Sequence, residues 1–395
     1  MTPSQGNHGE DVKECYFHLD NTPTHSYLKL LYKYPQAEFP YQRPIAENQC
    51  RQGNGREFEL LDSGVFDGDC YFDIFMEYAI STVEDMAIRI EAVNRGPQRA
   101  PLDILPHPWF RNTWSWGPEA WGPTTCPEPT IRPGPEGEDF LSLVSDDSGM
   151  EMLAHVPIRY RLGPRIFFAP RGGTPIFTDN ESNGPVVFGP GSRSRKPYVK
   201  DAFHRWLIHG EECVNPAQSG TKAAIHYHFA AVPAGGSVTL RFRLSDQAGQ
   251  VAPLAAVDAV IDQRRAEADE FYAAIHPSGA GEDQRRIQRQ ALAGLLWTKQ
   301  SYIFDVRQWL DGDNPQLPPP ASRRAARNQH WRHLNSLRVM TVPDKWEYPW
   351  FATWDLAFQC VAFTLIGRPV RPALRRAPGP RAMLGDADRW ATPSQ

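Results

Sequence analysis

The stretch Asp344–Phe358, DKWEYPWFATWDLAF, combines carboxyl groups with a dense set of aromatic side chains. Asp355 directly follows Trp354, and a carboxyl group held among aromatic rings loses hydration, which raises its pKa toward the range that suits a general acid. Glu347 stands eight residues earlier in the same stretch, so one pocket can hold both groups. The residue types indicate acid–base chemistry on a ligand that stacks on aromatic rings, such as a sugar.

Each of these carboxyl groups also has a structural interpretation that the residues leave open. Asp355 precedes the apolar run LAFQCVAF and suits the N-terminal cap of a helix. Glu347 suits an ion pair with Lys345 at the surface. A second aromatic cluster, WFRNTWSW at Trp109–Trp116, fits either core packing or the lining of a sugar-sized cleft, with Trp114 and Trp116 on one face.

Two histidine pairs have spacings that metal sites use. His226 and His228 share one face of an expected strand, but no third ligand is evident, so the spacing favours an exposed pair on the polar face. His330 and His333 have helical spacing, and a surface or structural role is again favoured. The acidic turns DGDCYFD and LDGDNP lack the twelve-residue ligand pattern of a calcium loop. The sequence predicts no metal and no cofactor.

Composition limits the class of protein and of partner. The chain has 395 residues and a net charge of −4, which gives no electrostatic reason to expect nucleic acid or an anionic membrane as partner. Its six cysteines form no CxxC pair, and the N-terminus has no signal-peptide pattern, so we expect a cytoplasmic protein with reduced thiols. No apolar run is long enough for a membrane span, and no GxSxG, P-loop or GxGxxG motif is present. Oligomeric state stays open.

Apolar residues alternate with period two through the first part of the chain. Runs such as MAIRIEAV (86–93), AIHYHFAAV (224–232) and VTLRFRLS (238–245) predict strands with one apolar face. The last two runs are joined by PAGG, which predicts a hairpin. Many such runs separated by Gly and Pro predict an antiparallel β-sandwich domain over residues 1–247.

The period changes to that of a helix near residue 255. It predicts a linker helix within 248–281, then a long helix from 282 to 310 with an apolar stripe that includes Ile287. LAFQCVAFTLIG predicts a buried helix that ends at Gly367, and the Arg-, Pro- and Ala-rich tail 368–395 predicts disorder. The fold class is therefore α+β, with the β-rich part first.

Several long blocks carry a family resemblance. DKWEYPWFATWDLAFQC, LLWTKQSYIFDVRQWLDGD, HPWFRNTWSWG and GNHGEDVKECYFHLDNTPTHSYLKLLYKYPQAEFPY resemble the bacterial branch of glycoside hydrolase family 63, the family of mannosyl-oligosaccharide glucosidase. The likeness runs from about Gly6 to Gly367. It implies a β-sandwich followed by an (α/α)6 barrel, of which 282–367 would be the start. It also implies cleavage of α-glucosidic bonds with inversion, by one carboxyl group as acid and another as base.

The resemblance maps the general acid onto Asp355. It implies that the sugar is bound by Trp346, Glu347, Tyr348, Trp350, Phe351, Trp354, Lys299 and Tyr302. The likeness stops at Gly367, and the family's general base, a Glu, would lie beyond it. We therefore expect an inverting α-glucosidase-type hydrolase of oligosaccharides whose chain, as written, has little or no turnover. The alternatives are a carbohydrate-binding or structural β-sandwich module without catalysis, and a fragment with no function of its own.

Overall fold

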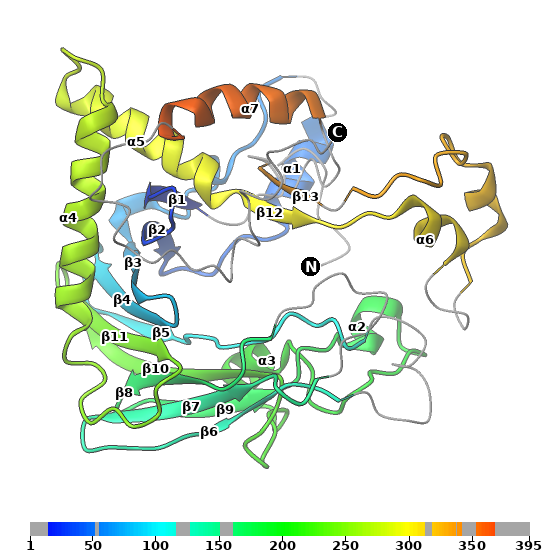
Figure 1. Cartoon of the computed structure of the whole chain (residues 1–395). Helices are drawn as coiled ribbons and strands as arrows, with labels where there is room; N and C mark the ends of the chain where they lie inside the picture. The colour runs from blue at the N-terminus through cyan, green and yellow to red at the C-terminus, as the bar shows by residue number, and fades with distance from the viewer. Residues whose placement is uncertain are drawn as a thin grey trace.

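Two antiparallel sheets, a two-stranded ladder and a set of helices make up the computed structural model, which describes residues 15–51, 55–115, 127–150, 161–312, 318–336, 338–341 and 353–367 (Figure 1). The strands of the eight-stranded sheet are, in spatial order, β1 (Cys15–Asn21), β2 (Tyr27–Pro35), β3 (Tyr71–Thr82), β4 (Asp85–Asn94), β11 (Ser237–Ser245), β8 (Arg165–Pro170), β7 (Phe140–Asp146) and β6 (Thr130–Pro133). The three-stranded sheet consists of β5 (Ala100–Ile104), β10 (Lys222–Val232) and β9 (Thr174–Thr178). The expected α+β class is confirmed.

The two sheets pack face to face over one apolar core. Alternation along the strands turns Ile90 of β4 and Phe242 of β11 toward Ile225 and Tyr227 of β10, and all four are buried. The rings of Tyr227 and Phe242 meet edge to face, with centroids 6.1 Å apart. This shared core makes the two sheets a sandwich.

The predicted hairpin between 224–232 and 238–245 is wrong. β11 pairs with β4 and β8, whereas β10 pairs with β5 and β9, so the PAGG turn carries the chain from one sheet to the other. Both strands keep the predicted apolar face, but the two faces meet across the core. Alternation reports which face is buried and does not distinguish a neighbour in the same sheet from one in the opposite sheet.

The other face of the large sheet is covered by helix α4 (Val257–Ile275), within the predicted linker segment. Ala79 of β3 and Ala87 of β4 pack against Ile261 and Ala268 of α4. Because small residues line this face, the helix lies close to the strands and the middle of the sheet is buried on both sides. Figure 1 shows α4 running alongside β3, β4 and β11.

The long helix predicted from 282 to 310 is broken. Helix α5 (Glu282–Trp297) is followed by β12 (Lys299–Tyr302) and by α6 (Val306–Asp311), and β12 pairs with β13 (Arg338–Thr341). Ile287 of the predicted stripe is exposed, and Leu292 and Leu296 are buried instead. Pairing with β13, some forty positions later, supplies backbone bonds that a helical period cannot reveal.

Helix α7 (Thr353–Ile366) ends where the sequence predicted, just before Gly367. Its predicted burial is wrong, because Gln359 and Ile366 are its buried residues. Figure 1 shows α7 lying beside α5, on the side of the large sheet where β1 is located. Its apolar residues point in several directions, and α5 and β13 cover only part of that surface.

Shorter elements complete the described chain. They are α1 (Arg43–Arg51), α2 (Gly184–Phe188), α3 (Ala202–His209) and the 3₁₀ turns Leu60–Ser63, Asp67–Asp69 and Ala321–Ala325. Within the described ranges, none of the helices combines the length and the apolar character that a bilayer crossing requires. The tail 368–395 lies outside the described residues.

Candidate functional site

The predicted sugar-site residues that the structure describes lie on β12 and α7. Lys299 begins β12 opposite Thr341 of β13, and the Thr341 hydroxyl hydrogen-bonds the Gln359 side chain of α7. The Lys299 ammonium lies 5.9 Å from the ring centroid of Phe363 on α7. Lys299 therefore sits where β12 and the second half of α7 meet. Tyr302, at the other end of β12, is half-buried.

Asp355 lies in the first turn of α7 and is exposed. Its neighbour Trp354 has 77% of its surface exposed. Asp355 precedes Phe363 by eight residues, which is about 12 Å along a helix axis, so Asp355 and Lys299 lie toward different ends of α7. The described residues do not provide the desolvation that the sequence argument requires of Asp355. The remaining predicted sugar-binding residues lie outside the described part of the chain: Trp346, Glu347, Tyr348, Trp350 and Phe351.

A group of buried polar side chains lies in the β1–β2 turn, near Lys299. His25 adopts a left-handed backbone conformation (φ 53°), and its Nδ1 lies 3.0 Å from Oδ1 of Asn21. Burial, and to a smaller extent the charge of Lys299, lowers the pKa of His25 to about 4. Burial also lowers the pKa of Lys299. A neutral imidazole beside a lysine suits hydrogen bonding to hydroxyl groups of a ligand.

Two atoms of this turn are buried without a hydrogen-bond partner among the described residues. They are Oδ1 of Asp20 and Nδ2 of Asn21. This group of residues was not predicted from the sequence, because the segment DNTPTHSY was considered only as part of the family resemblance. The signal was present in the run of short polar residues between two strands, of which Asp20, Asn21, Thr22 and Ser26 become buried.

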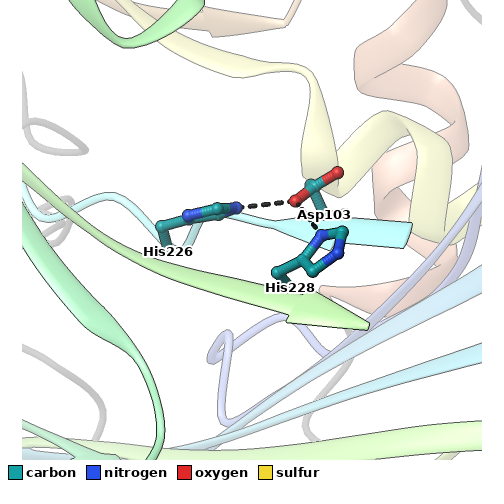
Figure 2. Close-up of side chains that lie close together, drawn as sticks. All are labelled: Asp103, His226 and His228. Atoms are coloured by element: carbon teal, nitrogen blue, oxygen red, sulfur yellow. Dashed lines mark hydrogen bonds and ion pairs between the residues drawn. The ribbon is translucent and has the colours of Figure 1, made fainter. Parts of the chain in front are cut away.

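A second cluster lies on the outward face of the small sheet, where β10 carries His226 and His228. The register places His228 directly opposite Asp103 of β5. Figure 2 shows both imidazole rings directed at one carboxylate: Oδ1 of Asp103 lies 2.6 Å from Nε2 of His226 and 2.8 Å from Nδ1 of His228. The three ligand atoms all lie within 4.8 Å of one another.

The environment of this cluster is graded from buried to exposed. The side chains of His226, Asp103 and His228 are 14%, 31% and 56% exposed. The ring of Trp206 on α3 meets that of His226 edge to face, at a centroid distance of 5.4 Å. Partial burial raises the pKa of Asp103, but the hydrogen bonds from both histidines outweigh it and hold the pKa below its ordinary value.

The structure corrects the interpretation of His226 and His228 as an exposed pair without a third group. His226 is largely buried, and Asp103 supplies the third group from 123 residues earlier. In PLDIL, Asp103 is the one carboxylate on the polar face of a short apolar strand, which was the available signal. Which strand β5 would pair with could not be predicted from local spacing.

The aromatic cluster Trp109–Trp116 is divided between core and surface. Trp114 is fully buried, and its indole N–H donates to Oε1 of Glu181 at 3.0 Å, which supports the core-packing alternative. Trp109 is exposed, and Trp116 lies outside the described residues.

Comparison with known proteins gives one extended sequence match. No family model matches the chain. The uncharacterized protein YMR196W of Saccharomyces cerevisiae is 37% identical over 399 residues, which cover 93% of this chain and 36% of the yeast protein. The chain thus spans about a third of the length of that curated relative. Among solved structures, a candidate aldose 1-epimerase of Escherichia coli K12 aligns with 55% of this chain and 64% of its own at 10% identity, with a TM-score of 0.19. A likeness at that score supports no argument about fold or function.

Proposed function

We propose that this chain is part of an inverting glycoside hydrolase that cleaves α-glucosidic bonds of oligosaccharides, with Asp355 as the general acid. One observation carries the proposal. Trp354 and Asp355 are consecutive residues, both are exposed at the start of α7, and they belong to a block that resembles glycoside hydrolase family 63. An exposed carboxyl group beside an exposed indole is accessible to a sugar. A sugar stacked on Trp354 would itself exclude water from Asp355 and raise the pKa of the acid on binding.

The chemistry assigned to Asp355 is protonation of the leaving oxygen as the glycosidic bond breaks. A water molecule attacks the anomeric carbon from the opposite face and loses its proton to a second carboxylate, about 6.5–9.5 Å from the first. The proposal assigns only the acid. When the second carboxylate is missing, the rate of the catalysed step falls by a factor of about 10²–10⁴. We therefore expect slow turnover from this chain.

Lys299 and Tyr302 would bind the same ligand from β12. Asp355 lies about 12 Å along α7 from Phe363, the residue that Lys299 contacts. That distance exceeds the width of one sugar ring, so a ligand that reaches both groups has more than one sugar unit. This spacing favours an oligosaccharide over free glucose. The neutral His25, beside Lys299, would add a hydrogen bond to a sugar hydroxyl.

The proposal is tested with purified wild-type chain and the Asp355→Asn variant. We expect wild-type chain to release glucose slowly from a maltooligosaccharide, and azide to accelerate the reaction and yield β-glucosyl azide, because azide attacks without a general base. Asp355→Asn should abolish this cleavage and retain binding, measured by tryptophan fluorescence. The loss should be smaller with a 4-nitrophenyl α-glucoside, because nitrophenolate leaves without a proton.

Asp283→Asn is the matched control, since Asp283 is also an exposed Asp in the first turn of a helix. It should leave both cleavage and binding unchanged. Binding of the sugar without any cleavage, with or without azide, would contradict the hydrolase and support a carbohydrate-binding module. Cleavage that survives in Asp355→Asn at the wild-type rate would remove Asp355 as the acid.

A further inference from the structure

Three donor side chains on two paired strands face the same side of the small sheet. Asp103 and His228 are opposite partners in the β5–β10 ladder, and His226 lies two positions before His228 on the same face of β10. β10 is also paired with β9 on its other side, where His226 is opposite Thr174. Hydrogen bonds on both edges therefore fix the backbone that carries the histidines. Rigid strands are the kind of support that a preformed binding site needs.

The two imidazole nitrogens converge on one point. Nε2 of His226 and Nδ1 of His228 lie 2.6 and 2.8 Å from the same atom, Oδ1 of Asp103. In a tetrahedral zinc site with bonds of about 2.0–2.1 Å, ligand atoms lie about 3.3 Å apart. Each of the two N···O separations must therefore lengthen by about 0.5–0.7 Å for an ion to enter between the three atoms, which lie within 4.8 Å of one another. The Asp103 side chain is 31% exposed, which leaves it space to move.

The surroundings hold one ligand in place and leave the other accessible. Trp206 packs edge to face on the ring of His226, which restricts its rotation. His228 is 56% exposed, so an ion and its water molecules can reach the cluster from solvent.

We propose that Asp103, His226 and His228 bind a divalent transition-metal ion, Zn²⁺ above all, and leave one or more coordination positions to water. Two imidazoles and one carboxylate are donors that suit Zn²⁺ and its neighbours in the first transition series. Ca²⁺ and Mg²⁺ bind sites built of oxygen donors, so they do not compete here. The site lies on the sandwich and is independent of the role proposed for Asp355.

Calorimetric titration of the metal-free full chain with Zn²⁺ tests the proposal. We expect one ion per chain. Each of His226→Gln, His228→Gln and Asp103→Asn should weaken binding by more than about 100-fold, because changing even an outer-shell partner of a zinc ligand costs about 10–100-fold. His209→Gln is the matched control, since His209 is an exposed histidine at the end of α3, and it should bind as wild type does. Ca²⁺ should give no heat of binding.

Two further measurements distinguish binding at this cluster from binding elsewhere on the chain. Thermal unfolding without metal should give similar midpoints for the wild type and the variants, whereas Zn²⁺ should raise the midpoint only for wild type and His209→Gln. Co²⁺ should show the visible bands of nitrogen and oxygen coordination. Equal Zn²⁺ binding in wild type and the three variants would overturn the proposal. An intense sulfur-to-cobalt band would also overturn it, because the ion would then be bound by thiolates such as those of the exposed Cys50 and Cys360.

Discussion

The β-sandwich and the helical segment after Glu282 differ in what covers their apolar side chains. Phe242, on β11, is 0% exposed, whereas Phe358, on α7, is 78% exposed. The sequence predicts burial for both, from the period-two alternation around Phe242 and from the apolar run around Phe358. Phe242 meets the opposite sheet through Tyr227 and stacks on Phe167 within its own sheet, but the described residues provide no such second layer over Phe358.

This difference shows that a side chain is buried only where a second layer of structure packs on it. The amino-acid composition determines only which side chains would be stabilised by such burial. The strands β3 and β4 have layers on both faces, the small sheet on one and α4 on the other. Among the described residues, helix α7 packs mainly through its C-terminal half, where Phe363 and Ile366 join a cluster with α4 and α5, and its exposed residues include Trp354 and Val361. The contrast between covered and uncovered side chains is therefore tested by making the same substitution at a buried and at an exposed position and comparing the changes in stability.

The largest expected effect is that of Phe242→Ala. Removing a fully buried ring costs the transfer free energy of the lost atoms and leaves a cavity, together about 3–5 kcal/mol of unfolding free energy. Phe358→Ala deletes the same ring from an exposed position, and we expect a change within about 0.5 kcal/mol. Urea unfolding followed by circular dichroism measures both. A loss above about 2 kcal/mol for Phe358→Ala, on the scale of a core truncation, would mean that α7 is covered in solution.

The next effect is that of Glu77→Gln, which removes a buried charge between the large sheet and α4. Glu77 accepts hydrogen bonds from the Tyr27 hydroxyl at 2.5 Å and from the guanidinium groups of Arg89 and Arg265 at 2.6 and 2.7 Å. Arg89 and Arg265 would keep their ion pairs with Asp258 and Asp262, each at 3.1 Å, but the loss of the buried counterion that they share should cost about 3 kcal/mol. Glu270→Gln, at an exposed position of α4, should cost less than about 0.5 kcal/mol when measured in the same way.

The pH dependence of stability checks the same group. Burial raises the pKa of Glu77, but hydrogen bonds from Tyr27, Arg89 and Arg265 outweigh it and hold the pKa at about 2, below the ordinary value of 4.5. Because folding lowers the pKa, the stabilisation is complete above about pH 4.5 and is lost as the pH falls toward 2. The difference between wild type and Glu77→Gln should therefore shrink across that window. A constant difference would show that packing, and not charge, is lost.

Much of the fold could be predicted from the sequence, because local period reports local structure. The strands β4, β10 and β11, the helix α4 and the end of α7 at Gly367 follow from periods of two or about 3.6. The pairing of strands could not be predicted. Both the mistaken hairpin and the break after Trp297 arise because a partner strand, β4 in one case and β13 in the other, lies far along the chain.

The candidate sites show the same limit. His226 and His228 were recognisable because their spacing is local, whereas Asp103 joins them only through the register of β5 on β10. His25 comes near Lys299 through a turn between two strands that nothing local links to residue 299. Asp355 was recognised from its own neighbours in sequence. The alternative interpretation made Asp355 the N-terminal cap, whereas α7 begins two residues earlier, at Thr353, and Asp355 lies inside its first turn.

The smallest expected effects have opposite signs in the two regions. Gly235, in the turn that links the two sheets, has φ +69°, and Gly294 lies inside α5; neither has an atom within 4 Å of where a Cβ would lie. Because there is space for a Cβ atom at both positions, the backbone conformation alone determines whether alanine stabilises or destabilises the chain. Gly235→Ala should cost about 1 kcal/mol because L-residues are strained at positive φ. Gly294→Ala should gain about 0.5–1 kcal/mol from helix propensity.

Differential scanning calorimetry on the two glycine variants and their double mutant measures these changes. The sites lie on separate elements without shared partners, so the two shifts should add and nearly cancel in the double mutant. If Gly294→Ala also destabilised the chain, the middle of α5 would be closely packed against something in solution, and the contrast between a covered sandwich and open helices would fail at that point. If Gly235→Ala were neutral, the turn between the sheets would tolerate another backbone conformation.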